Sequence, residues 1–231
     1  MRILGIDTSG YVNAVGVIDG EQVLADFTFE ARTDSLEKIV SNIDMALKSA
    51  NLTLDDIYGI GVGLGPGSWT GIRVGVTVGK ILAYSTDKPV CGVPTLEVLA
   101  YSARNESSLI CPIISTGTGD TVYAAFYRAG DGNIARVGEY YVGDMPGLAK
   151  MLSESTVFVG LGAESYRQLI SREAGSSKIS IRAVEAVPGG AVVARLAAIR
   201  LARGESDDVL SLTPLYLKES TAKAFINRYS R

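Results

Sequence analysis

The chain has 231 residues, of which 47% are hydrophobic, and its 22 basic and 25 acidic side chains give a formal net charge of -3. This length and apolar content are enough for one large domain or two small ones, and they exclude a disordered chain. The slight negative charge argues against a large basic surface that binds nucleic acid, so any RNA contact should be local or made through a partner.

Histidine is absent, which removes Ser-His and Cys-His nucleophile pairs and every histidine-metal site. Cys91 and Cys111 are the only cysteines and are isolated, so we expect reduced, buried thiols and no metal site. No stretch approaches the roughly 20 consecutive apolar residues of a membrane span, and the first residues lack the apolar core of a signal peptide. We therefore expect a cytoplasmic protein without a membrane contact.

The first half of the chain predicts three antiparallel strands, because Asp19-Gly20 is a strong hairpin signal between alternating apolar runs. Asp34 with Glu37 forms a capping-box pattern at the start of the helix that follows. The expected strands are residues 2–6, 11–18, 22–30, 57–64 and 89–93, and the expected helices are 34–50, 69–85 and 95–104.

The second half predicts the same order again. Its expected strands are residues 109–114, 121–128, 134–142 and 156–161, and its helices are 146–153, 163–172 and 190–203, the last ended by Gly204. Both halves begin with an apolar strand that ends in a small polar turn, IDTSG and then ISTGT. We therefore predict two copies of one α/β unit, residues 1–104 and 105–231, with a C-terminal tail that could pack back on the first.

The turn Asp7-Thr8-Ser9 lies between two paired strands. Its hydroxyl and N–H groups could receive a phosphate, with Asp7 orienting water or Mg²⁺. The same residues could equally form a local turn that satisfies its own backbone. The equivalent turn at residues 116–120 carries Asp120 at a position that does not match Asp7, so it could be purely structural.

Residues 63–80, GLGPGSWTGIRVGVTVGK, resemble a phosphate loop but fail both standard fingerprints. GxGxxG would need glycine where Ser68 or Thr70 stands, and Gly79-Lys80 is followed by isoleucine where the Walker pattern needs Ser or Thr. What remains is a tight turn, a good N-cap at Ser68 and a helix.

That helix carries glycines at 71, 75 and 79, which share one side and cost about 1 kcal/mol each against alanine. Close approach by another element would offset this cost. One polar strip crosses an otherwise apolar surface and consists of Thr70, Arg73, Thr77, Lys80 and Tyr84. The wide apolar arc predicts a second contact beyond the sheet, either with the chain's own second half or with another protein, anchored by Trp69 and Arg73.

Three motifs, ILGIDTS, GVGLGPGSWTGIRVG and TPLYLKES, resemble those of the bacterial TsaB (YeaZ) proteins, in order and along the whole chain. The middle motif is usually GPGSFTGLRIG, and here Trp69 replaces Phe and Ile72 replaces Leu. These proteins are paralogues of the catalytic TsaD proteins of tRNA threonylcarbamoyladenosine synthesis. The resemblance implies two tandem actin/Hsp70-like domains with mixed sheets flanked by helices, and a non-catalytic subunit.

The resemblance also implies partners: a TsaD-type catalytic paralogue, a TsaE-type ATPase, and tRNA only within the complex. For the isolated chain the sequence leaves a monomer or a homodimer open, the latter because an exposed apolar face favours self-association. No cofactor is expected for the isolated chain, although ATP or ADP could bind at an interface shared with the catalytic partner. The first two helices would form the partner surface. Its expected residues are Leu36, Ile39, Val40, Ile43, Trp69, Gly71, Arg73, Val74, Gly75, Val78, Gly79 and Leu82.

Two features leave alternatives open. Ser35 stands where related chains often keep a histidine, a departure that could reflect a different partner. The basic C-terminal tail could touch RNA or an acidic partner, or simply be solvated. The competing hypothesis for function is an actin-fold ATPase or small-molecule kinase that uses Asp7, Thr8 and Ser9 on phosphates.

Overall fold

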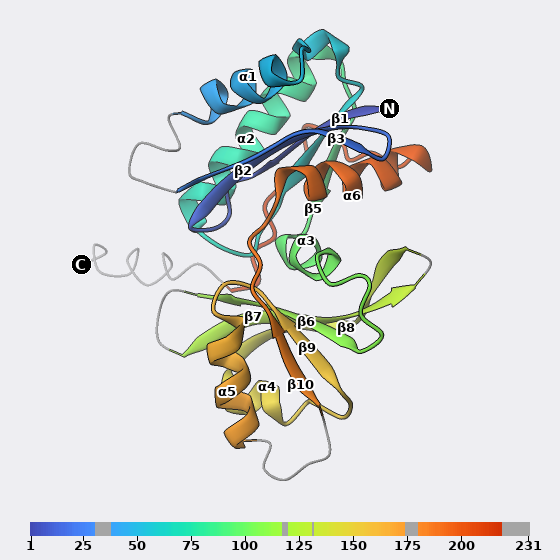
Figure 1. Ribbon diagram of the computed structural model, residues 1–231. Coiled ribbons are helices and arrows are strands. Elements are labelled where there is room, and N and C mark those ends of the chain that lie inside the picture. The colour runs from blue at the N-terminus through green and yellow to red at the C-terminus, as the bar shows by residue number, and fades with distance from the viewer. Residues whose placement is uncertain (31–37, 117–119, 131, 174–179, 219–231) are drawn as a thin grey trace, which may run out of the picture.

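The computed structural model describes residues 1–30, 38–116, 120–130, 132–173 and 180–218 (Figure 1). Its first sheet has the order β3-β2-β1-β4-β5, with β1, β2 and β3 antiparallel and β1, β4 and β5 parallel. The strands are β1 (Arg2–Asp7), β2 (Val12–Asp19), β3 (Gln22–Glu30), β4 (Gly59–Gly63) and β5 (Val90–Val93).

The second sheet repeats this arrangement with the order β10-β9-β6-β7-β8. Its strands are β6 (Leu109–Ser115), β7 (Thr121–Gly130), β8 (Asn133–Asp144), β9 (Thr156–Val159) and β10 (Ile181–Val184). β6, β7 and β8 are antiparallel, whereas β6, β9 and β10 are parallel. The predicted duplication is confirmed, and the sequence had missed only β10, the counterpart of β5.

The helices lie close to their predicted ranges. They are α1 (Ile39–Ser49), α2 (Trp69–Thr86), α3 (Thr95–Tyr101), α4 (Met145–Ala149), α5 (Ala163–Glu173) and α6 (Gly190–Ala202), with one 3-10 turn, η1 (Leu54–Asp56). Ser68 caps α2 as predicted, since its hydroxyl oxygen accepts a hydrogen bond from the Gly71 N–H at 3.3 Å. The capping box predicted at Asp34 and Glu37 lies outside the described residues.

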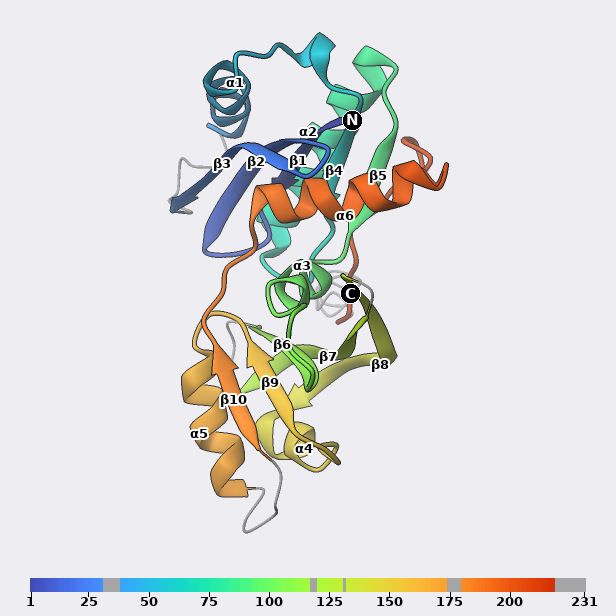
Figure 2. The same cartoon turned by 45° about the vertical axis from the view of Figure 1, so that its right-hand side comes forward.

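The two halves exchange their last helix. α1 and α2 cover one face of the first sheet, and the opposite face is covered by α6 from the end of the chain (Figure 2). The contact is close, because a Cβ at Gly5 or Gly16 would overlap the backbone of α6. In turn α3, which follows β5, packs on β6, β7 and β8 of the second sheet, while α4 and α5 cover its other face.

This exchange crosses the predicted boundary between the two units. Residues 190–202 were placed with the second unit from their position in the chain, yet α6 buries Ala191, Val193 and Ala197 against the first sheet. Residues 207–217 also return to the first half, where Leu212 joins the core beneath α2. The chain therefore crosses between the halves after β5 and crosses back after β10.

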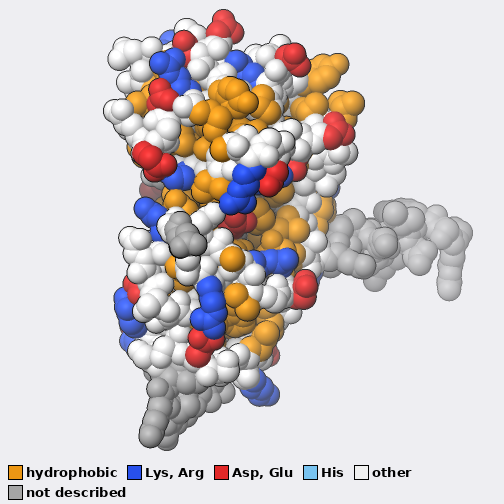
Figure 3. Space-filling model, turned by 90° about the vertical axis from the view of Figure 1, so that its right-hand side faces the viewer, with side chains coloured by type: hydrophobic (Ala, Val, Ile, Leu, Met, Phe, Trp, Pro, Cys, Tyr) orange, Lys and Arg blue, Asp and Glu red, His pale blue; other side chains and the backbone are white. Residues whose placement is uncertain are grey.

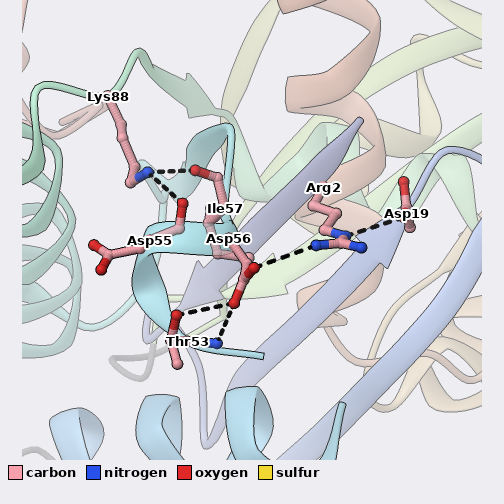
Figure 4. Close-up of polar contacts among 7 residues, drawn as sticks. All are labelled: Arg2, Asp19, Thr53, Asp55, Asp56, Ile57 and Lys88. Atoms are coloured by element: carbon pink, nitrogen blue, oxygen red, sulfur yellow. Dashed lines mark hydrogen bonds and ion pairs between the residues drawn. The ribbon is translucent and has the colours of Figure 1, made fainter. Parts of the chain in front are cut away.

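One corner of the first sheet is tied by polar contacts at its rim (Figure 4). Arg2 bonds the Asp19 carboxylate at 3.1 Å and lies 3.5 Å from that of Asp56. Asp56 in turn accepts hydrogen bonds from the N–H and hydroxyl of Thr53 at 2.8 and 2.9 Å, which hold the pKa of the Asp56 carboxyl below its usual value. Lys88 joins the same corner by donating to the main-chain oxygens of Asp55 and Ile57.

Candidate functional site

The turn after β1 is closed and buried. Asp7 Oδ1 accepts hydrogen bonds from the N–H and the hydroxyl of Ser9, at 2.8 and 2.6 Å. Thr95 Oγ1, at the start of α3, lies 3.0 Å from both Asp7 Oδ2 and Ser9 Oγ and accepts a hydrogen bond from the Gly65 N–H at 3.1 Å. Asp7, Ser9 and Thr95 are buried and their side chains are hydrogen-bonded to one another, and Thr8 is buried beside them.

Burial also affects the charge of this turn. Desolvation raises the pKa of the Asp7 carboxyl above its ordinary value, although the hydrogen bonds from Ser9 and Thr95 act in the opposite direction. Asp7 is therefore poorly suited to hold a metal ion or a nucleophilic water at the surface. Among the described residues no three acidic, cysteine or histidine side chains come together as a possible metal site.

The glycine side of α2 faces this turn. Thr8 donates its hydroxyl proton to the Gly71 carbonyl at 2.6 Å, and the Ser68 N–H bonds the Ser9 carbonyl at 2.6 Å. A Cβ at Gly71 would overlap the Thr8 carbonyl oxygen, and one at Gly75 would overlap Thr8 Oγ1. Gly71, Gly75 and Gly79 are buried.

The prediction that these glycines admit a helix of another protein is therefore wrong. They let α2 lie directly on the chain's own β1–β2 turn and on β4, where a Cβ at Gly79 would overlap the Val62 side chain. The periodicity correctly grouped the three glycines on one side. It could not say that this side faces inward.

A phosphate does not fit the turn as it stands. The hydroxyls of Thr8 and Ser9 and the carboxylate of Asp7 all have partners within the chain, and the first turn of α2 lies over them. Most of the matching turn in the second half, residues 117–119, lies outside the described residues. The hydrogen bonds of the described turn connect β1, α2 and α3, which is a structural role.

One buried polar side chain near the turn was missed by the sequence reasoning. Asn13 on β2 is fully buried, and neither its amide nitrogen nor its amide oxygen has a hydrogen-bond partner among the described residues. Because Ala14 pairs with Asp7, Asn13 lies next to the turn in the ladder of strands. A single asparagine in an alternating strand carries no periodic signal that would mark it.

The expected partner surface divides into buried and exposed residues. Ile39 and Ile43 of α1 belong to the core, as does the glycine side of α2, while Val74, Val78 and Leu82 are half-buried against that core. Leu36 lies outside the described residues. Val40 of α1 is 59% exposed, and Ile81 and Tyr84 of α2 are 60% and 71% exposed. These three form, with Met45, Trp69 and Arg73, what we call the outer helix surface.

The polar strip of α2 holds the chain's own C-terminal segment. Lys80 Nζ donates to the carbonyls of Leu210 and Leu212 at 3.0 and 2.9 Å. Arg73 donates to the Tyr216 hydroxyl at 3.0 Å, and its guanidinium lies 4.1 Å from the ring centre of Trp69. Trp69 also packs on the Tyr216 ring, with 4.3 Å between ring centres. The two predicted anchors thus already contact a segment of this chain, although Trp69 stays partly exposed.

The two cysteines are buried, as predicted. Both are free and buried, and burial raises the pKa of Cys91 to about 11 and that of Cys111 further still. Within the described residues, no helix combines the length and the apolar character that a membrane crossing requires.

Comparison with known proteins identifies the relatives of this chain. A family model described as TsaD, tRNA N6-adenosine threonylcarbamoyltransferase, matches residues 29–224. The chain is also 29% identical, over 97% of both sequences, to the TsaB protein of Bacillus subtilis, named for tRNA threonylcarbamoyladenosine biosynthesis. This chain belongs to the TsaD family, in its TsaB (YeaZ) branch.

Solved structures confirm the fold expected for a TsaB-family chain. YeaZ from Pseudomonas aeruginosa matches with a TM-score of 0.79 at 22% identity, covering 94% of this chain and 99% of that one. A ROK hexokinase from Thermus thermophilus matches with a TM-score of 0.55 at 15% identity, covering 87% and 100%. The two sheets and their helices are therefore the actin-like arrangement predicted from the sequence.

The two halves of this TsaB-family chain differ in the side chains that α2 and its counterpart α5 expose. α5 is the counterpart of α2, but its exposed positions are mostly polar and include Glu164, Ser165 and Gln168. α2 instead exposes large hydrophobic side chains. The large exposed hydrophobic side chains are therefore more numerous on α2, where they stand beside its polar strip and form part of the outer helix surface.

Proposed function

We propose that this chain is a non-catalytic subunit in tRNA threonylcarbamoyladenosine synthesis and that its outer helix surface binds a TsaD-type catalytic paralogue. The observation that carries the proposal is the exposure of Val40, Ile81 and Tyr84 on helices α1 and α2. Exposed apolar side chains gathered on adjacent elements are typical of protein contacts. The polar character of α5 makes the feature specific to one half.

The chemistry of the chain supports a subunit without catalysis. Histidine is absent from the whole sequence, and the Asp7-Thr8-Ser9 turn is buried and internally bonded. A group that must abstract a proton or bind a phosphate has to reach the substrate. The alternative function, an ATPase or kinase using that turn, would require α2 to move off Thr8 and Ser9.

Further partners follow from the family and are part of the same proposal. A TsaE-type ATPase would join the complex, tRNA would contact this chain only within it, and ATP or ADP would bind at an interface shared with the catalytic paralogue. When the chain is alone, the outer helix surface would pair with a second copy, since an exposed apolar surface of this kind favours self-association. The complex would act in the cytoplasm.

The test uses charge on the outer helix surface. Ile81→Arg and Val40→Asp should each weaken the complex with the TsaD-type paralogue at least about tenfold, because a charge would be buried without a partner. Leu169→Arg on α5 is the matched control and should leave the affinity unchanged, since it is an exposed leucine on the equivalent helix of the other half. Native mass spectrometry of the mixed proteins and reconstituted tRNA modification would give the two readouts.

The proposal fails if both charged variants keep the complex and the modification activity. Titration of the isolated chain with ATP and Mg²⁺ addresses the alternative separately. Tight binding that is lost in Asp7→Ala would favour the ATPase or kinase function instead.

A further inference from the structure

A cavity of about 350 Å³ lies where the two halves of the molecule meet. Its walls come from the end of β5, the first turn of α3, α6 and the C-terminal segment. Figure 3 shows the molecule from the side on which α6 ends, where hydrophobic side chains gather at the waist among acidic and basic ones. The volume falls at the lower end of the range of small-molecule sites.

Most of the cavity wall is apolar, and the polar groups are few. Leu64, Val93, Pro94, Leu196 and Leu212 supply the apolar wall. Arg200 also lines the cavity, but its guanidinium is already committed to the Asp207 carboxylate at 2.9 and 3.0 Å and to the Gly92 carbonyl at 2.9 Å. An anionic ligand would therefore find no free cation in this lining.

Glu97 is the exception among the polar groups of the lining. Its carboxylate makes no hydrogen bond and no ion pair with any described residue, although it interacts electrostatically with Arg200 and Arg136. Burial raises its pKa, which shows that these two cations do not compensate its desolvation. A half-buried carboxylate without a partner is a costly group for a folded protein to keep.

A second buried polar group lies in the same region. The Tyr127 hydroxyl on β7 meets no partner with full hydrogen-bond geometry among the described residues. Burial raises the pKa of the Tyr140 phenol, and Tyr127 is close enough to that hydroxyl to act in the opposite direction. The Tyr127 hydroxyl also interacts electrostatically with Glu97. The guanidinium of Arg136 does not satisfy it, because Arg136 stacks on the Tyr140 ring at 4.1 Å and faces Glu139 at 3.9 Å. Within the described part of the chain, the Glu97 carboxylate thus lacks the partner that a buried charged group normally has, and the Tyr127 hydroxyl near it is incompletely satisfied.

We propose that this cavity binds a small organic cation, with a protonated amine at the Glu97 carboxylate and an apolar body against the leucines and Pro94 of the wall. The ammonium donates to the carboxylate that has no other donor, and the apolar body removes the exposed leucine surface from water. Because α3 covers the second sheet and α6 covers the first, the ligand contacts both halves and stabilises one orientation between them. The site is distinct from the outer helix surface and from the Asp7 turn.

The experiment is a calorimetric titration of the whole chain with hexylammonium chloride, beside 1-hexanol as the neutral probe of similar shape. Wild type should bind the ammonium saturably and the alcohol at least about tenfold more weakly, the loss expected for one charge-assisted hydrogen bond. Glu97→Gln should weaken ammonium binding by the same factor. Glu139→Gln, an exposed acid outside the cavity, should change it less than twofold.

Leu196→Phe gives a second and independent variant, because it fills the cavity and leaves the Glu97 carboxylate in place. It should also abolish binding, and circular dichroism confirms that each variant is folded. The proposal is overturned if wild type does not bind hexylammonium at millimolar concentration, or if Glu97→Gln and Leu196→Phe bind it as wild type does. None of these measurements involves the TsaD-type partner, so their outcome is independent of the proposed function.

Discussion

Thr8 donates its hydroxyl proton to the main-chain carbonyl of Gly71 at 2.6 Å, across 63 positions of the sequence. The contact is possible because α2 has no side chain at 71 and 75, where a Cβ would overlap Thr8. A turn whose sequence resembles a phosphate site is thereby used to seat a helix. The glycines of α2 lose about 1 kcal/mol each in helix propensity, and the close packing on the turn offsets that loss.

Gly75→Ala should lower the free energy of unfolding by about 1–3 kcal/mol, since the added methyl group overlaps Thr8 Oγ1 and outweighs the gain in helix propensity. Thr8→Ala should cost about 1 kcal/mol for the lost hydrogen bond. The double variant should be less destabilised than the sum of the two, because removing the hydroxyl makes room for the methyl. Urea unfolding of the four proteins measures this coupling, and strict additivity would contradict the packing described here.

Asp7→Asn should leave the protein at least as stable as wild type at pH 7. Burial raises the pKa of Asp7 in the folded chain, so the stability that its protonated form contributes is present below the unfolded value of 3.8. That stability is lost as the pH rises through the folded value. Asparagine is neutral throughout and can still accept the hydrogen bonds from Ser9.

The measurement is urea unfolding of wild type and Asp7→Asn at pH 7 and at pH 4.5. The free energy of unfolding of wild type should increase relative to that of the variant as the pH falls. A variant that is much less stable than wild type at pH 7 would show instead that the ionised carboxylate is required in this turn.

Asp207→Ala should expose the free edge of β5. Asp207 accepts from the Gly92 N–H at 2.7 Å, and Arg200 donates to the Gly92 carbonyl, so the ion pair occupies the place of a neighbouring strand. Hydrogen bonds from Arg200 and Gly92 lower the pKa of Asp207 although partial burial alone would raise it. Its contribution is therefore present above the unfolded value of 3.8 and is lost as the pH falls through the folded value.

The expected loss for Asp207→Ala at pH 7 is about 1–2 kcal/mol, together with faster hydrogen exchange of the Gly92 amide. Asp44→Ala is the control, because Asp44 forms only an exposed i,i+4 pair with Lys48 and should change stability little. Unchanged protection of Gly92 would rule out the edge-covering role.

Lys80→Met should loosen the C-terminal segment from α2 while leaving the sheets intact. The variant keeps the length of the side chain but loses the two hydrogen bonds to the carbonyls of Leu210 and Leu212. The Leu215 amide, which bonds the Leu64 carbonyl at 2.9 Å, should then exchange at least about tenfold faster, because each lost hydrogen bond contributes about 1 kcal/mol. Lys48→Met on α1 should leave this amide unaffected.

The sequence predicted most of the helices and strands and which of their residues share a face. Hairpin and helix periods located nine of the strands closely because each depends on neighbours within a few residues. β10 was missed because its four residues, IRAV, are too short and too mixed to show an alternating pattern. Which element packs against a given face depends on how distant segments of the chain cross between the halves. Periodicity carries no information about these crossovers.

This limit explains the two errors about α2 and α6. The three glycines were correctly grouped but assigned to a partner, because nothing local distinguishes a helix that approaches another protein from one that approaches its own β1–β2 turn. α6 was assigned to the second domain because it follows the elements of that domain in the chain. Val40 was placed on the partner surface and is exposed, whereas Ile39 and Ile43 beside it are core residues. The helical period alone could not decide which of these apolar residues face the core and which face solvent.

The exchange of α3 and α6 also bears on how the protein is made. During synthesis the first sheet emerges with only α1 and α2, and its other face stays bare until residue 202 has left the ribosome. A fragment ending at residue 104 would likewise carry α3 without the sheet that α3 covers. Each half therefore needs a helix of the other half to cover its sheet. Two fragments divided at that boundary should fold only when they are expressed together.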